Sequence, residues 1–146
     1  MADWDARWLD LAGEVAKWSK DRSTKVGCIV VGDGKRLLCC GYNGFPRGID
    51  DDTADRHERP LKYMLTEHAE RNAIYNAARE GVDLHNSVMY STLYPCADCA
   101  RGIIQSGIAE VVTREPDWNL PIWGFSFTVS RIMLQEAGVH VRLVAP

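Results

Sequence analysis

The stretch from Glu67 to Cys99 constrains the chain most, because it joins two short motifs that are typical of metal ligands. It opens on His-Ala-Glu at 68–70 and closes on Pro-Cys-Ala-Asp-Cys at 95–99. One imidazole and two thiolates, from His68, Cys96 and Cys99, form a nitrogen and sulfur ligand set that suits Zn²⁺. Three protein ligands leave the fourth tetrahedral position open for water, as a catalytic zinc requires.

Glu70 adds a carboxylate to this predicted site. The pattern H-x-E followed by P-C-x-x-C is the signature of zinc-dependent nucleobase deaminases, in which the Glu is not a metal ligand. Hydrolytic removal of an amino group from an aromatic ring needs water as nucleophile and protons for the ring nitrogen and the leaving amine. We expect Glu70 to take the proton from water, deliver it to the ring nitrogen, and deliver another to the amine, which leaves as ammonia.

Other interpretations of these motifs explain less. A closed structural zinc site needs a fourth protein ligand, yet Cys28, Cys39 and Cys40 lie in apolar runs, where buried thiols are expected. A thioredoxin-like role for the Cys-x-x-Cys pair leaves the His and the Glu without a task. A non-catalytic zinc-stabilised binding module has no use for Glu70 beside an open metal position.

The bulk properties predict one cytoplasmic domain over residues 1–146. A chain of 146 residues with 46% apolar residues can bury a sizeable core. The net charge of −3 gives no reason to expect a nucleic-acid or membrane partner. Five cysteines, an odd number, fit a reducing compartment better than a disulfide framework. No secretory signal and no membrane span are evident.

Hydrophobic periodicity and turn residues predict an alternation of helices and strands. A hairpin near the start and helix-linked strands after it predict a three-layer α/β/α domain over a mixed five-stranded sheet, with the last two strands parallel. Expected helices cover 4–20, 67–80, 95–106 and 123–137, with one further helical turn at 61–65; expected strands cover 26–31, 36–42, 87–93, 108–113 and 139–144. The long irregular segment 45–66 is expected to form a wall or lid of the active site.

The chain resembles the cytidine deaminase superfamily, and within it the deoxycytidylate (dCMP) deaminases. The similarity extends beyond the zinc motifs, from about Trp4 to Val144. It rests on four blocks in order: Ser-Thr-Lys-Val-Gly-Cys-Ile-Val at 23–30, Gly-Tyr-Asn-Gly-Phe-Pro-Arg-Gly at 41–48, His-Ala-Glu-Arg-Asn-Ala-Ile at 68–74 and Ile-Gln-Ser-Gly-Ile at 104–108. The resemblance implies the deaminase fold, a zinc-dependent active site, and a homo-oligomer.

The resemblance also implies contacts with the substrate. Asn43 would contact the sugar, the backbone around Ala69 and Cys96 would hold the pyrimidine carbonyl, and Tyr94 would line the base pocket. For the phosphate, charge and position alone suggest Lys25 and Arg47.

The expected reaction is the deamination of dCMP to dUMP and ammonia. Two features depart from the family pattern. The insertion before the zinc motif offers only His57 as a further ligand, which predicts a single zinc per chain. The aromatic segment 117–125 lies where the far wall of the pocket is expected, so a nucleoside, a free base or another amino-heterocycle is an alternative substrate. An RNA- or DNA-editing deaminase is a further alternative, which the net charge disfavours.

Overall fold

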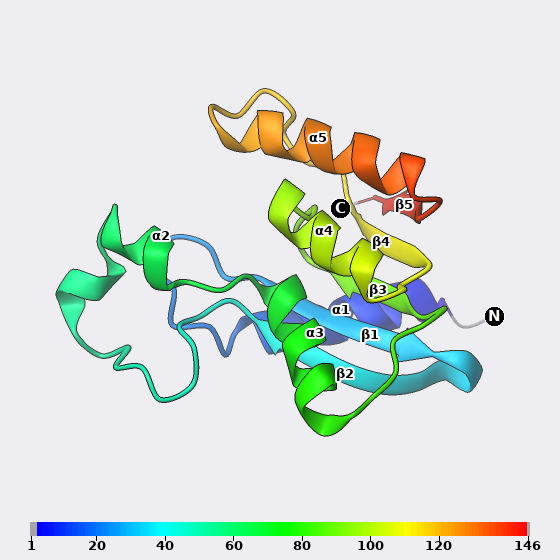
Figure 1. Ribbon diagram of the computed structural model, residues 1–146, viewed down its shortest axis with the longest axis horizontal. Coiled ribbons are helices and arrows are strands. Elements are labelled where there is room, and N and C mark those ends of the chain that lie inside the picture. Colours follow the sequence, from blue (N-terminus) through cyan, green and yellow to red (C-terminus); the bar gives the residue numbers. More distant parts are fainter. Residues whose placement is uncertain (1–2, 146) are drawn as a thin grey trace.

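The computed structural model describes residues 3–145, and its centre is one mixed five-stranded sheet (Figure 1). The strands are β1 (Gly27–Gly32), β2 (Arg36–Tyr42), β3 (Val88–Ser91), β4 (Glu110–Arg114) and β5 (His140–Val144), in the order β2-β1-β3-β4-β5. The strand β1 is antiparallel to β2 and β3, whereas the pairs β3/β4 and β4/β5 are parallel. The predicted fold class, including the parallel last pair, is therefore confirmed.

Helices cover both faces of this sheet. They are α1 (Trp4–Ala16), α2 (Leu61–Leu65), α3 (Ala69–Glu80), α4 (Ala97–Gln105) and α5 (Trp123–Glu136), with short 3₁₀ turns at Asp33–Lys35 and Ala54–His57. Figure 1 shows α1 behind the sheet and α3 and α4 in front of it, with α5 beside α4. None of the helices within residues 3–145 is long and apolar enough to cross a membrane.

The alternation of side chains along β1 builds two separate cores. Cys28 and Val30 point to the face that α3, α4 and α5 cover, where they are fully buried. Ile29 and Val31 point to the opposite face and pack against α1. Because both faces of β1 are buried, its sequence is a continuous apolar run and does not alternate between apolar and polar residues.

Tertiary contacts move several element boundaries from where the sequence predicts them. The helix α1 ends at Ala16 rather than near Lys20, because the buried Ser19 turns away to donate a hydrogen bond to the carbonyl of Asn43, at 2.7 Å. The helix α3 begins at Ala69 rather than at Glu67, because Glu67 is extended and pairs with Gly44. The remaining helix and strand ends differ by one or two residues, the ordinary uncertainty of such boundaries.

Gly41 fixes how closely α3 lies on the sheet. A Cβ at this position would lie 2.4 Å from the nitrogen of Ala73 and 2.5 Å from the carbonyl oxygen of Ala69. Only glycine permits that approach of two backbones. The first turn of α3, which carries part of the zinc motif, is therefore held directly against β2.

The segment 45–66 forms an arm that extends away from the sheet and carries α2 (Figure 1). Three ion pairs tie it to the segment between α1 and β1. Lys62 Nζ lies 3.0 Å from Asp21 Oδ1, and both side chains are more than nine-tenths buried. Lys20 contacts Asp51 and Asp52 at the surface. The arm is thus anchored beside the mouth of the cavity described below.

Candidate metal centre and active site

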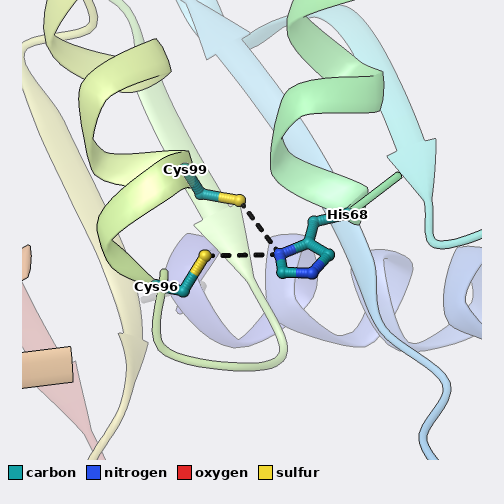
Figure 2. Close-up of side chains that lie close together, drawn as sticks. All are labelled: His68, Cys96 and Cys99. Carbon is teal, nitrogen blue, oxygen red and sulfur yellow. Dashed lines mark hydrogen bonds between the residues drawn. The ribbon is translucent and has the colours of Figure 1, made fainter. Parts of the chain in front are cut away.

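Two helix N-termini bring the three predicted zinc ligands together. His68 is the N-cap residue of α3, Cys96 is the N-cap residue of α4, and Cys99 is buried in the first turn of α4. Figure 2 shows both sulfur atoms directed at the imidazole. His68 Nδ1 lies 3.3 Å from Cys96 Sγ and 3.4 Å from Cys99 Sγ. Within residues 3–145 these three side chains form the one cluster with the spacing of a metal site.

The spacing and the chemistry of this cluster fit zinc. A tetrahedral Zn²⁺ at its usual bond lengths separates a nitrogen ligand from a sulfur ligand by roughly 3.5 Å. A hydrogen bond from the Cys99 thiol lowers the pKa of Cys96 well below its usual value, and His68 acts in the same direction. The same shared proton raises the pKa of Cys99. Two thiolates so close together repel each other, and a divalent cation bound between them would neutralise their charges.

Glu70 lies beside this cluster, in the first turn of α3. Only 3% of its surface is exposed, and its Oε1 accepts a hydrogen bond from Ser91 Oγ at 3.2 Å. Burial raises the pKa of Glu70 to about 7, against an opposing effect of His68. A carboxyl group with a pKa near neutrality can both accept and return a proton.

A cavity of about 260 Å³ opens at the metal cluster. Its inner part is lined by His68, Glu70 and Cys96, together with the aromatic rings of Tyr94 and Phe127. Its outer part is lined by the segment before β1 and by α2 and its flanks: Asp21, Ser23, Thr24, Arg59, Lys62, Tyr63 and Thr66. Because α2 lies apart from the starts of α3 and α4 (Figure 1), the cavity runs from a metal-binding end with aromatic walls to a polar end formed by the arm and the segment before β1.

Three of the predicted substrate-binding residues line this cavity, namely Asn43, Ala69 and Tyr94. Asn43 is also used within the fold. Its Oδ1 accepts from the N–H of Val26 at 2.8 Å, and its Nδ2 donates to the carbonyl of Thr24 at 2.8 Å. One Nδ2 hydrogen therefore remains for a ligand.

The two predicted phosphate contacts lie outside the cavity lining. Lys25 is exposed, and Arg47 donates a hydrogen bond to Asn76 Oδ1 on the exposed side of α3. The cations that line the cavity are instead Arg59 and Lys62. The sequence places Lys25 and Arg47 near the site along the chain, but it does not predict which way their side chains point.

The aromatic segment 117–125 forms part of the far wall, as its position in the sequence predicts. Leu120 and Trp123 line the cavity, and the Trp123 ring lies 5.9 Å from the His68 ring. Trp118 packs behind the wall, with its ring 5.2 Å from that of Tyr94 in an edge-on arrangement. Ile122 and Phe125 point to the surface.

Three residues of the site escape the sequence motifs. Ser91 orients Glu70 from the end of β3, and Arg59 stands at the polar end of the cavity. Thr66 lines the cavity with a buried hydroxyl that has no hydrogen-bond partner within the described chain. Ser91 lies within the predicted strand 87–93, which leads into the cysteine motif, and this is a weak signal. Arg59 and Thr66 lie in the irregular segment, where no pattern points to them.

Known proteins share this sequence and this arrangement. A family model described as the cytidine and deoxycytidylate deaminase zinc-binding region matches residues 2–115. The chain belongs to this family. Its zinc-dependent deaminase character and the resemblance to dCMP deaminases are thereby confirmed.

Curated relatives match this deaminase over nearly its whole length. A deaminase of Aliivibrio fischeri, described as an uncharacterized deaminase in the luxG 3′ region, is 41% identical over 142 residues, covering 97% of this chain and 93% of that protein. The deoxycytidylate deaminase of Homo sapiens is 33% identical over 150 residues, covering 99% of this chain and 81% of that protein.

Solved structures share the fold of this deaminase. The dCMP deaminase of the cyanophage S-TIM5, in complex with dCMP and dUMP, superimposes with a TM-score of 0.80 at 27% identity. The match covers 99% of this chain and 98% of the phage enzyme. The chain therefore has a structural counterpart of nearly equal length in an enzyme whose structure holds dCMP and dUMP.

Proposed function

We propose that this deaminase hydrolyses dCMP to dUMP and ammonia. The observation that carries the proposal is the cavity, in which a metal-binding cluster and a buried carboxyl group lie at one end and cations lie at the other. Such a cavity suits a small amino-heterocycle that carries an anionic group at its far end. The matching relatives named deoxycytidylate deaminases and the phage complex with dCMP and dUMP support the same substrate.

In the proposed mechanism His68, Cys96 and Cys99 hold the zinc. When bound, zinc supplies Lewis-acid activation of water near neutral pH. Glu70 takes a proton from the attacking water and passes it to the ring nitrogen next to the amino-bearing carbon. The hydroxyl group now on the ring carbon gives its proton to the Glu70 carboxylate, which passes this second proton to the amine. The C–N bond then breaks, the ring carbonyl forms, and the amine leaves as ammonia. Burial keeps bulk water away from Glu70, so the proton is transferred locally.

The remaining cavity residues orient the substrate. Tyr94 and Phe127 offer aromatic surfaces to the base, and we assign the pyrimidine carbonyl to the backbone around Ala69 and Cys96, which line the same cavity. We assign the sugar to the free Nδ2 hydrogen of Asn43, since this amide is already fixed by its bonds to Val26 and Thr24. A side chain held in this way loses little freedom when the substrate binds.

The deciding experiment measures ammonia release by the zinc-loaded protein with dCMP, deoxycytidine and cytosine in parallel. We expect the largest kcat/KM for dCMP. The Glu70→Gln variant should lose activity by at least about 100-fold, as expected for loss of a general acid–base group, and should keep its zinc. If deoxycytidine or cytosine reacted as fast as dCMP, the proposed substrate would be an unphosphorylated compound and not the nucleotide. Near-normal turnover by Glu70→Gln would overturn the mechanism.

We further propose that the enzyme acts on the free nucleotide as a homo-oligomer in the reducing cytoplasm. All five cysteines are free thiols, and three of them lie outside the metal cluster. Exposed apolar side chains near the mouth, such as Met64, Ile122 and Phe125, are suited to an interface between subunits. Light scattering tests the oligomer. Salt-sensitive binding to an oligonucleotide would instead favour an editing enzyme.

A further inference from the structure

Two cations stand at the polar end of the cavity, and they differ in how much of their charge is compensated. The ammonium of Lys62 lies 3.0 Å from the carboxylate of Asp21, and both side chains are over nine-tenths buried. It also donates to Ser23 Oγ, at 3.2 Å. The charge of Lys62 is therefore neutralised within the fold, and its hydrogen bonds hold the arm in place.

Arg59 carries the uncompensated charge at this end of the cavity. Its side chain makes no ion pair with any residue between 3 and 145. Its Nε donates to the hydroxyl of Tyr63, and the guanidinium lies 5.5 Å from the centre of the Tyr63 ring. These contacts fix the guanidinium plane while both terminal NH₂ groups stay available, which is the arrangement that a bidentate phosphate contact requires.

Other groups around this end favour an anion as well. With Arg59 and Lys62 positive and Asp21 negative, the three charged residues there sum to +1. Ser23 Oγ accepts from Lys62 and so keeps its own hydrogen for donation into the cavity. Arg59 and Lys62 belong to the arm, which lies apart from the N-termini of α3 and α4 that hold the metal cluster (Figure 1).

We propose that Arg59 binds the 5′-phosphate of the substrate and is the residue that selects a nucleotide over a nucleoside. The proposal rests on the function proposed above and replaces Lys25 and Arg47 in this role. Tyr63 is the positioning residue for Arg59, through its hydroxyl and its ring. Ser23 supplies a second hydrogen-bond donor to the same phosphate.

The test measures equilibrium binding of dUMP and deoxyuridine to the zinc-loaded protein by titration calorimetry, so that it does not depend on turnover. We expect Arg59→Ala to weaken dUMP binding by about 10- to 100-fold, the range for losing hydrogen bonds to a charged group, and to leave deoxyuridine binding unchanged. The affinity of Arg59→Lys for dUMP should lie between those of the wild type and Arg59→Ala. Lysine keeps the positive charge but lacks the two parallel N–H donors of the guanidinium. Arg56→Ala is the matched control, since Arg56 lies on the same arm, bonds the carbonyl of Asp50 and is not part of the cavity lining.

The outcomes separate this proposal from the proposed function. Ammonia release from dCMP together with unchanged dUMP binding in Arg59→Ala would overturn the phosphate assignment and leave the function intact. Arg59-dependent binding of dUMP without ammonia release from dCMP would uphold the phosphate site and overturn the function. An equal loss of dUMP and deoxyuridine binding would assign Arg59 a structural role and overturn the proposal.

Discussion

Ser91 contacts Glu70 through a hydrogen bond that helps to direct its carboxyl group. Its hydroxyl lies within hydrogen-bond distance of Glu70 Oε1 and of the carbonyl of Leu93, at 3.2 and 2.9 Å, and the side chain is fully buried. A general acid–base group needs both a suitable pKa and a fixed direction. Ser91 therefore acts through Glu70 without touching the reacting atoms.

We expect Ser91→Ala to lower kcat for dCMP about 10-fold, the equivalent of one hydrogen bond to a charged group, with little change in KM. Zinc content should stay at the wild-type level. Ser87→Ala is a matched control, because the buried Ser87 hydroxyl donates to the carbonyl of Leu84, at 2.6 Å, and is not part of the cavity lining. Steady-state kinetics with metal analysis measures both effects. An unchanged kcat in Ser91→Ala would show that Glu70 is oriented by other contacts.

At the scale of single residues, prediction from sequence succeeded where a motif encodes chemistry. His68, Glu70, Cys96 and Cys99 could be predicted as neighbours because their types and order are typical of one kind of site. Arg59 could not, because the segment that carries it has no periodicity and its guanidinium is directed by a local contact with Tyr63.

Among the secondary-structure elements, the contact of α3 with β2 places the first turn that carries Glu70. This contact depends on the absence of a side chain at Gly41. Sequence periodicity predicts that α3 exists but not where it begins, since its start is set by the pairing of Glu67 with Gly44. That pairing also brings the loop of Asn43 to the cavity.

We expect Gly41→Ala to destabilise the fold by about 2 kcal/mol or more, because its Cβ overlaps backbone atoms of α3 that cannot yield. Gly13→Ala is the matched control. Gly13 lies inside α1 with open space around it, so alanine there should stabilise by roughly 0.5–1 kcal/mol. Urea unfolding of the zinc-loaded proteins measures both. Equal stabilities of the two variants would contradict the close approach of α3 and β2.

Across the whole molecule, the zinc ligands join two helices that come from separate parts of the chain. The turns that begin α3 and α4 meet at His68, Cys96 and Cys99, and α4 in turn packs on α5. A metal bound there links the front layer of helices, and its binding free energy adds to the free energy of unfolding.

We expect one zinc per chain by elemental analysis, and we expect removal by a chelator to lower the thermal unfolding midpoint. Cys96→Ser should show a lower midpoint before chelation and little further change after it. Cys40→Ser serves as a control for metal content, because Cys40 lies on β2 and packs with the core on the opposite face of the sheet. A second zinc, or full metal content in Cys96→Ser, would contradict the ligand assignment.

The arrangement of the layers could be predicted from the sequence, whereas the position of the arm could not. Helical connections imply parallel strands by right-handed crossover, so the parallel pairs β3/β4 and β4/β5 follow from the order of elements. No such rule places the segment 45–66. Its position depends on ion pairs formed by Lys20 and Lys62 with residues distant in the sequence.

The far wall of the cavity and its metal ligands belong to different helices, which has a consequence for redesign. Leu120, Trp123 and Phe127 come from the start of α5 and the loop before it, whereas the ligands come from α3 and α4. A combinatorial library at these three wall positions would vary the size and shape of the accepted ring while the reaction chemistry stays constant. This enzyme is thus a suitable scaffold for evolving deaminases toward other amino-heterocycles.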